Sequence, residues 1–286
     1  MLLFNITNGL IIGAFYVLMA LGLSMILNLS GVINFAHGGF LALGGYFAYS
    51  IEPAVGFWVA LLVAPIAVGF LGLIFERFMV RRLYGRDPLY GLLLTFGLSF
   101  VLQDFCRYVW GANGVPFTVP DYLSSPLSSD MFFLTGYRVF MVVMVAVAVA
   151  ALFAFLKYTR VGVRIRAGTL DLDTVSVLGV NVRALRAFNF ALGIFLAGLS
   201  GVLAGGQLSL TPNMGDALLM PSFIAIIVGG VGSLGGTLVG GLLIGVAAGL
   251  VTVWWPSASD AVMYVIMAVV LLARPRGLFG EEGLLT

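Results

Sequence analysis

Long apolar runs alternate with short polar stretches along the whole chain. A transmembrane helix needs about 20 mostly apolar residues, and nine runs are predicted as passes: residues 9–29, 40–50, 57–75, 91–110, 139–156, 188–206, 220–230, 237–253 and 261–273. Because the run at 220–230 is short and some segments can re-enter, we expect eight or nine transmembrane helices. The pattern predicts an all-α polytopic membrane protein, with residues 1–286 forming a single transmembrane domain.

Glycine-rich interruptions break this pattern once in each half of the chain. The sequence SGVINFAHGG occupies residues 30–39, and GSLGG occupies residues 232–236. Backbone groups freed by such breaks are tolerated in a bilayer only where protein or a water-filled cavity satisfies them. We therefore expect discontinuous or re-entrant segments, a weak internal duplication, and a substrate path between the two breaks. Glu52 and Pro53 are predicted to form an external turn.

The distribution of charge predicts the orientation. Only 9% of residues are charged and 61% are hydrophobic, which excludes a soluble domain. Arginine and lysine gather at residues 77–86, 157–186 and 274–276, whereas residues 111–136 contain none. The positive-inside rule places the basic stretches in the cytoplasm, with the N-terminus outside and the C-terminus cytoplasmic. A net charge of +2 does not suggest a nucleic-acid partner.

Residue types needed for several kinds of chemistry are missing. One cysteine, Cys106, excludes an internal disulfide, and one histidine, His37, leaves no zinc-binding constellation. The single lysine, Lys157, follows Leu156, so the chain lacks the Gly-Lys-Ser/Thr of a phosphate-binding P-loop. We expect no catalytic residues, no metal, and no cofactor bound by this chain.

The longest polar interruption, residues 157–186, contains a predicted short helix. Asp171 is suited to cap its N-terminus, Asp173 adds negative charge to the first turn, and Gly179 is suited to end it. Leu172, Val175 and Leu178 are predicted to share one face. A helix of about two turns is unstable alone, so this face is expected to dock on the protein's own loops or on a cytoplasmic partner.

Two further groups of residues are candidates for packing and for the substrate path. Small residues recur every four positions in one run and predict a close helix–helix approach: Gly193, Ala197, Gly201 and Gly205. Polar residues in or beside breaks could contact a small zwitterion or amide: Asn34, His37 and Gln103. Both readings of the polar group stay open, because these side chains could equally satisfy local backbone.

Several stretches carry a family resemblance that covers nearly the whole chain. They resemble LivH-type permeases of branched-chain amino-acid ABC importers at residues 31–46, 95–104, 178–183, 229–236 and 274–280. Residues 173–179, DTVSVLG, are also similar to the E-A-A-x-x-x-G motif of ABC importer permeases, with Asp for Glu and with Thr and Val for the two Ala. Members of this family are associated with branched-chain amino acids, urea, amides and other small polar solutes.

The resemblance implies a location and a set of partners. The chain would lie in the bacterial inner membrane with a second, LivM-type permease, two cytoplasmic ATPase subunits and an extracytoplasmic solute-binding protein. ATP and Mg would be used by the ATPases. The segment at 157–186 would couple them to the permease through Asp171, Leu172, Asp173, Val175, Leu178 and Gly179.

Two other classes of function remain as alternatives. A self-sufficient secondary transporter or channel would need membrane-embedded charges, of which Asp104, Arg107 and Asp216 are available near outer ends; it would transport without ATP. An intramembrane serine protease would use Ser200, in the sequence GLSG, with His37 as its base.

Overall fold

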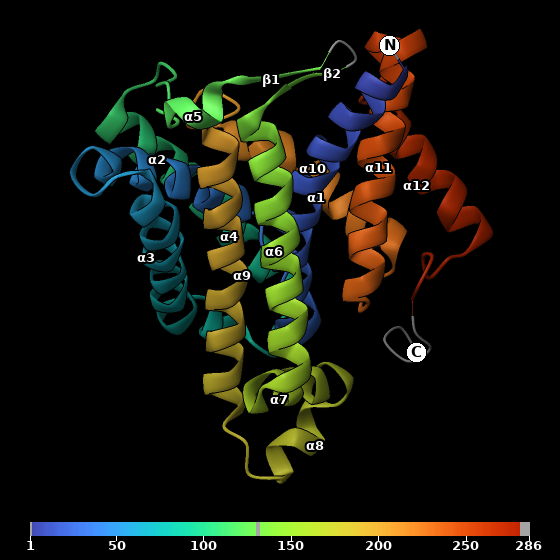
Figure 1. The fold of residues 1–286 in the computed structure, drawn as a ribbon. Helices are drawn as coiled ribbons and strands as arrows, with labels where there is room; N and C mark the ends of the chain where they lie inside the picture. The colour runs from blue at the N-terminus through green and yellow to red at the C-terminus, as the bar shows by residue number, and fades with distance from the viewer. Residues whose placement is uncertain (1, 130–131, 281–286) are drawn as a thin grey trace.

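The computed structural model describes residues 2–129 and 132–280. Long helices run side by side through most of its height (Figure 1). The helices of the first half are α1 (Leu2–Ser30), α2 (His37–Val55), α3 (Phe57–Phe78), the 3-10 turn η1 (Val80–Leu83), α4 (Pro88–Trp110) and α5 (Asp121–Ser124). Those of the second half are α6 (Gly136–Tyr158), α7 (Arg160–Leu170), α8 (Leu172–Val177), α9 (Val182–Gly205), α10 (Met214–Gly229), α11 (Leu234–Trp254), the 3-10 turn η2 (Pro256–Ala258) and α12 (Val262–Ala273).

Six helices in the described part of the chain are long and apolar enough to cross a membrane. They are Phe4–Ser30, Phe57–Leu83, Pro88–Trp110, Gly136–Tyr158, Val182–Gly205 and Leu234–Trp254. Every predicted run corresponds to a helix, and those at 40–50, 220–230 and 261–273 correspond to α2, α10 and α12. This architecture is that of a helical polytopic membrane protein.

Helices α1 and α9 form the centre of the bundle. In each, 78% of the most apolar window is buried inside the protein, against 22% in α6 and 28% in α4. Helix α1 packs against α9, α10 and α11, while α9 also packs against α2 and α3. Because α4 and α6 bury so little of their surface within this chain, they form its periphery.

Glycine contacts explain how α2 and α9 approach so closely. A Cβ atom on Gly201 would overlap the carbonyl oxygen of Leu41 and lie 3.1 Å from the backbone nitrogen of Gly45. A Cβ on Gly193 would lie 2.6 Å from the carbonyl oxygen of Gly22 in α1. The stripe of small residues on α9 therefore lies against the backbones of α1 and α2.

Three local predictions differ from the structure. Glu52 and Pro53 do not form a turn, since α2 continues through them to Val55. The chain reverses at Gly56 instead, whose φ of 80° strongly favours glycine. The first break is shorter than predicted, because His37 already begins α2. Helix α10 begins at Met214, six residues before the predicted run.

Two elements were not predicted. The loop after α4 contains a short antiparallel hairpin of β1 (Pro126–Ser129) and β2 (Phe132–Thr135), which lies near the N-terminal end of α1 in Figure 1. A full helix, α7, precedes α8 in the central polar segment. The sequence of α7, RVGVRIRAGTL, alternates basic and apolar residues, which hides its helical character from a search for apolar runs.

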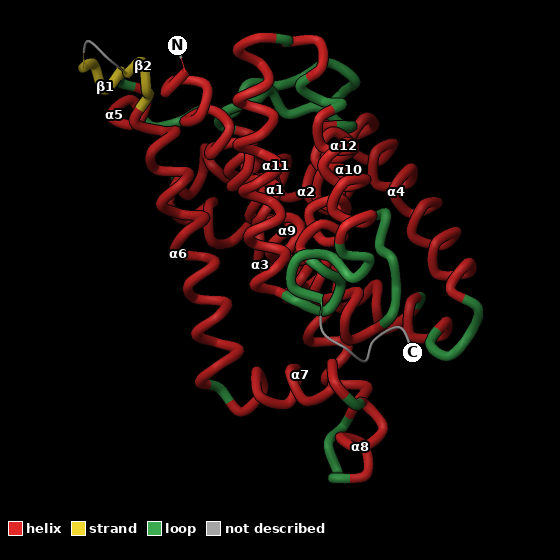
Figure 2. The backbone as a smooth tube through the Cα atoms, turned by 90° about the vertical axis from the view of Figure 1, so that its right-hand side faces the viewer, coloured by secondary structure: helices red, strands yellow, loops and turns green. Residues whose placement is uncertain are grey.

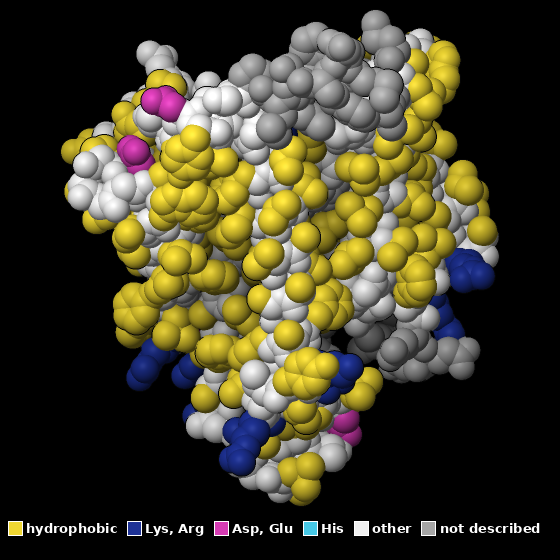
Figure 3. Space-filling model, in the orientation of Figure 1, with side chains coloured by type: hydrophobic (Ala, Val, Ile, Leu, Met, Phe, Trp, Pro, Cys, Tyr) yellow, Lys and Arg dark blue, Asp and Glu magenta, His cyan; other side chains and the backbone are white. Residues whose placement is uncertain are grey.

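The opposite end of the bundle from the hairpin carries most of the basic side chains, and we call it the basic end. Lys and Arg gather toward this end in the space-filling view (Figure 3). A polar cluster ties three segments together here. The fully buried Glu76 of α3 pairs with Arg81 at 3.1 Å and accepts a hydrogen bond from the hydroxyl of Tyr84, and the guanidinium of Arg186 lies over the Tyr84 ring at 4.4 Å.

Burial is the main cause that raises the pKa of Tyr84. Its hydroxyl group therefore stays protonated and remains a hydrogen-bond donor to Glu76 over the neutral pH range. The cluster fixes α3, η1 and the start of α9 relative to one another at the basic end.

Candidate functional site

Helices α7 and α8 form an arm, residues 159–181, that projects from the basic end. Both the ribbon and the side view show this arm extending beyond the ends of the long helices (Figures 1 and 2). Thr159 caps α7 by accepting a hydrogen bond from the backbone N–H of Gly162 at 3.0 Å. The two long helices α6 and α9 enter and leave the arm directly, so any displacement of it acts on both of them.

The N-terminus of α8 is capped as its sequence suggests. The Asp171 carboxylate accepts hydrogen bonds from the backbone N–H groups of Asp173 and Thr174, each at 3.0 Å, and from the Thr174 hydroxyl. These donors, the Thr174 hydroxyl first, lower the pKa of Asp171. Gly179 ends the element with a φ of 81°. Asp173 is exposed in the first turn, where negative charge favours the helix.

Leu172, Val175 and Leu178, the residues predicted to share one apolar face, differ in burial. Val175 is buried, at 5% exposure, and Leu172 is half-buried, whereas Leu178 is 75% exposed. Leu178 is the C-cap residue of α8, and its N–H still donates to the Thr174 carbonyl at 3.1 Å, but its side chain does not pack on the protein. Val177, which was not predicted, is 88% exposed, and Leu170 is 77% exposed. Two apolar residues thus hold α8 on the protein and three others face outward.

The backbone freed by the first break is satisfied by protein. The Thr95 hydroxyl of α4 accepts a hydrogen bond from the Phe35 N–H and donates one to the Ile33 carbonyl, both at 3.1 Å. Asn34 is fully buried, and its Oδ1 accepts from the Ala36 N–H at 3.1 Å. The hydrogen bond observed for Asn34 is therefore to local backbone, which is one of the two alternatives that the sequence left open.

His37 is enclosed in the bundle. It has no exposed surface, and a Cβ on Gly22 of α1 would lie 3.1 Å from its Nε2 atom. Ser200 is also fully buried, and no hydrogen bond joins it to His37. A nucleophile and its base must be within hydrogen-bond reach, so this geometry does not favour the protease alternative.

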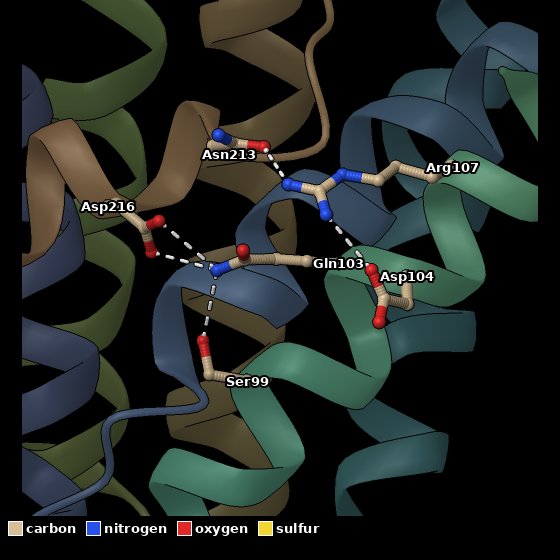
Figure 4. A network of polar contacts seen from close by, with 6 residues as sticks. All are labelled: Ser99, Gln103, Asp104, Arg107, Asn213 and Asp216. Carbon is tan, nitrogen blue, oxygen red and sulfur yellow. Dashed lines mark hydrogen bonds and ion pairs between the residues drawn. The ribbon is translucent and has the colours of Figure 1, made fainter. Parts of the chain in front are cut away.

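Gln103, the third candidate for the substrate path, belongs to a polar network between α4 and α10 (Figure 4). Its amide nitrogen donates to both carboxylate oxygens of Asp216, at 3.0 and 3.1 Å, and to the Ser99 hydroxyl at 3.3 Å. Arg107 pairs with Asp104 at 3.0 Å and donates to the Asn213 side chain at 3.1 Å. We call these six residues the α4–α10 network.

The position of the α4–α10 network makes it a candidate for contact with solute or protein. Gln103 is buried, but Asp104, Arg107 and Asp216 are exposed on a surface that is otherwise strongly apolar, including Phe100 and Val101. Charged groups facing lipid are costly. Two carboxylates against one guanidinium leave an excess of negative charge, which favours a cationic or ammonium group nearby.

Sequence reasoning missed Ser99 and Asn213 as members of this network and treated Asp216 only as an isolated charge. One signal was present: Ser99, Gln103 and Arg107 are spaced four residues apart, which places them on one helix face. The contribution from α10 had no such signal, because it depends on how α10 crosses the chain. Among the described residues, no group of three or more His, Cys, Asp or Glu side chains is arranged to hold a metal ion.

Comparison with known proteins places the chain in a family. Residues 5–272 match the model of a family described as the branched-chain amino acid transport system permease component. The high-affinity branched-chain amino acid transport system permease protein LivH of Salmonella typhimurium is 31% identical, over 96% of this chain and 94% of that protein.

Two further relatives have similar names. The permease protein BraD of Pseudomonas aeruginosa, from a high-affinity branched-chain amino acid transport system, is 29% identical over 97% of this chain and 95% of its own. LivM of Escherichia coli, the permease protein of such a system, is 25% identical over 92% of this chain and 67% of its own. The chain belongs to the family of permease components of branched-chain amino acid transport systems.

Proposed function

We propose that this chain is a transmembrane permease subunit of an ATP-driven importer for branched-chain amino acids or a related small polar solute, such as urea or an amide. The observation that carries the proposal is a capped short helix with exposed apolar residues, at the tip of a basic arm, in a chain of this family. A separate subunit must supply ATP hydrolysis, because the chain has no P-loop sequence.

In the proposed orientation the basic end faces the cytoplasm and the hairpin end faces outward, as the positive-inside rule requires. The N-terminus then lies outside and the C-terminus in the cytoplasm of a bacterium's inner membrane. Helices α2, α10 and α12 would bring the six longer helices to nine passes, an odd number that agrees with termini on opposite sides of the membrane. An extracytoplasmic solute-binding protein would deliver solute at the hairpin end.

Coupling to two cytoplasmic ATPase subunits would occur through the arm. Val177 and Leu178 provide the apolar contact, with each fully buried side chain contributing about 1.5–3 kcal/mol. Leu172 and Val175 hold α8 on the protein, while Asp171, Asp173 and Gly179 fix its two ends. Nucleotide-driven movement of the ATPases, which would bind ATP and Mg, would then reach α6 and α9.

A second, LivM-type permease would cover the α4 side of the chain. Only 28% of the most apolar window of α4 is buried within this chain, and its exposed surface includes the charged part of the α4–α10 network. Protein or a water-filled path against this face would remove the cost of exposing charge to lipid. The similarity to LivM supports this pairing, because paired permeases of related sequence can form a pseudo-symmetric path.

Replacement of Val177 and Leu178 by Asp tests the proposal. The variant chain is expected to insert and to accumulate normally, because neither side chain packs inside the protein, but to lose its ATPase subunits on purification. The control is Leu208→Asp, which places one negative charge on a half-exposed leucine at the other end. A Val177/Leu178 variant that keeps stoichiometric ATPase subunits and full solute uptake would show that the arm is only a connector.

A further inference from the structure

A groove at the basic end lies between the end of α3 and the start of α9, and its volume is about 360 Å³. We call it the α3–α9 groove. One side is lined by Leu73, Arg77 and Arg81, and the other by Asn181, Arg183, Ala184, Ala187 and Phe188. The wall therefore combines arginines from both sides with apolar side chains. Several of these residues are exposed, so the groove is open to the surroundings of the protein.

Two of the three arginines in the α3–α9 groove carry a charge that no carboxylate neutralises. Arg81 pairs with the buried Glu76 at 3.1 Å. Arg77 and Arg183 are exposed, and neither forms an ion pair within the described part of the chain. No Asp or Glu is among the described residues that line the groove. The guanidinium groups of Arg77 and Arg183 thus remain able to bind phosphate oxygens, which they match with two parallel hydrogen bonds.

The position of Arg183 is unfavourable for its own helix. Arg183 lies in the first turn of α9, which contains no acidic residue, and a helix N-terminus already carries partial positive charge. Arg77 differs, because it lies in the last turn of α3, where a cation is favourable. The positive-inside rule accounts for cations at this end of the bundle but not for a cation beside a helix N-terminus. An anion in the groove would offset this repulsion, since helix N-termini favour phosphate.

An exposed apolar stripe on α3 leads away from the α3–α9 groove. Ile66, Phe70, Leu73 and Arg77 are spaced three or four residues apart, which places them on one face of the helix. Ile66 is 60% exposed and Phe70 is 61% exposed. Figure 3 shows Lys and Arg side chains below the apolar surface near the lower end of α3. This face therefore presents apolar side chains along the membrane span and a cation near its end.

We propose that the α3–α9 groove binds a phospholipid with an anionic headgroup. Arg77 and Arg183 hold its phosphate, and one acyl chain follows Phe70 and Ile66 along α3. A soluble anion would leave the apolar stripe unused, and an acidic protein surface at the end of the bundle would not reach along it. Basic pockets between transmembrane helices are known sites for phospholipid headgroups. A bound lipid links the end of α3 to the start of α9, at the point where α9 leaves the arm.

The test is native mass spectrometry of the full-length chain, released from detergent with lipid added at known concentrations. Phosphatidylglycerol and phosphatidylcholine with the same acyl chains are the probes, so that the two lipids differ only in their headgroups. We expect phosphatidylglycerol to bind more tightly than phosphatidylcholine. Arg77→Gln combined with Arg183→Gln should weaken the tightest phosphatidylglycerol site about thirtyfold, because two basic residues beside the headgroup are lost. Binding of phosphatidylcholine should not change.

The matched control is Arg82→Gln combined with Arg86→Gln, which removes two positive charges from exposed residues at the basic end outside the groove. It should leave phosphatidylglycerol binding unchanged. A third pair, Arg77→Lys with Arg183→Lys, keeps the charge and loses only the paired hydrogen bonds, so it should bind phosphatidylglycerol more tightly than the glutamine pair does. Phosphatidylcholine is the reference in every variant, which separates loss of a headgroup contact from a general effect on folding.

Four results would overturn the inference: no preference for phosphatidylglycerol in the unmodified chain, an equal loss in the Arg82 and Arg86 pair, an equal loss in the lysine and glutamine pairs, or displacement of phosphatidylglycerol by an equal concentration of glycerol 3-phosphate. The last result would identify a site for soluble anions. If the unmodified chain shows no preference and the glutamine pair loses its ATPase subunits on purification, the groove is a protein contact and the inference is wrong. None of the binding measurements uses ATP or a transported solute, so their failure would leave the proposed function intact.

Discussion

Replacement of Gly201 by Ala tests the packing at the centre of the bundle. The new Cβ atom would overlap the Leu41 carbonyl oxygen and lie 2.7 Å from the Leu41 carbonyl carbon. Both are backbone atoms of α2, so no flexible side chain can move aside. The matched control is Gly97→Ala on α4, where a Cβ would meet nothing within 4 Å.

The two variants are expected to change the stability of the protein in opposite directions. Overpacking a core costs about 1–3 kcal/mol, and the upper end applies to Gly201 because helix α2 itself must shift. Alanine in place of glycine within a helix contributes about 1 kcal/mol of stabilisation. The net cost for Gly201→Ala is therefore about 2 kcal/mol, or a fall in Tm of about 4–8 °C at 2–4 °C per kcal/mol. Gly97→Ala should leave Tm unchanged or raise it.

The chain contains its own reporter for this measurement. Cys106 is the single cysteine and is fully buried on α4, so a thiol-reactive fluorescent dye reports unfolding as the temperature rises. Both variants retain Cys106, and the comparison uses the same detergent and scan rate. A Gly201→Ala variant with a Tm equal to or above that of Gly97→Ala would show that α2 and α9 do not approach as closely as described.

Two other predictions concern the basic end. Arg81→Met leaves the fully buried Glu76 carboxylate without its ion pair and should lower the free energy of unfolding by about 3 kcal/mol in the same dye assay. This value is the lower end of the usual range, because Arg81 is 32% exposed. A double variant with Glu76→Gln should recover part of this loss. Asp171→Ala should reduce hydrogen-exchange protection of α8, with Asp171→Asn less affected. Because hydrogen bonds lower the pKa of Asp171, its capping contribution should be complete above pH 3.8 and lost only as the pH falls through the lowered value, which protection factors measured against pH would reveal.

The sequence predicted most of the helices because hydrophobic runs and helix ends are local features. The cap at Asp171 and the positive φ of Gly179 follow from residue types alone. Helix α7 was missed because its arginines interrupt the apolar spacing. The turn predicted at Pro53 was wrong because α2 continues through Pro53 to Val55, and the chain reverses at Gly56, whose positive φ favours glycine.

The surroundings of the polar candidate residues depend on tertiary contacts, which the sequence does not reveal. The sequence placed Asn34, His37 and Gln103 together as possible substrate contacts, but their surroundings depend on which helices cross nearby. Asn34 accepts a hydrogen bond from the backbone of the break that contains it, and His37 is enclosed beside Gly22. Gln103 donates a hydrogen bond to Asp216 of α10. Polarity near a break thus identified residues with special environments without identifying what each one contacts.

ATP-dependent solute uptake is the direct test of whether this chain is a permease subunit driven by separate ATPases. Proteoliposomes would contain this chain with its co-purified permease, ATPase and solute-binding subunits, and labelled leucine uptake would be measured with ATP and with a non-hydrolysable analogue. We expect uptake only with hydrolysable ATP, and none from the chain alone. Concentrative uptake by the chain alone without ATP would contradict it and identify the protein as a self-sufficient transporter.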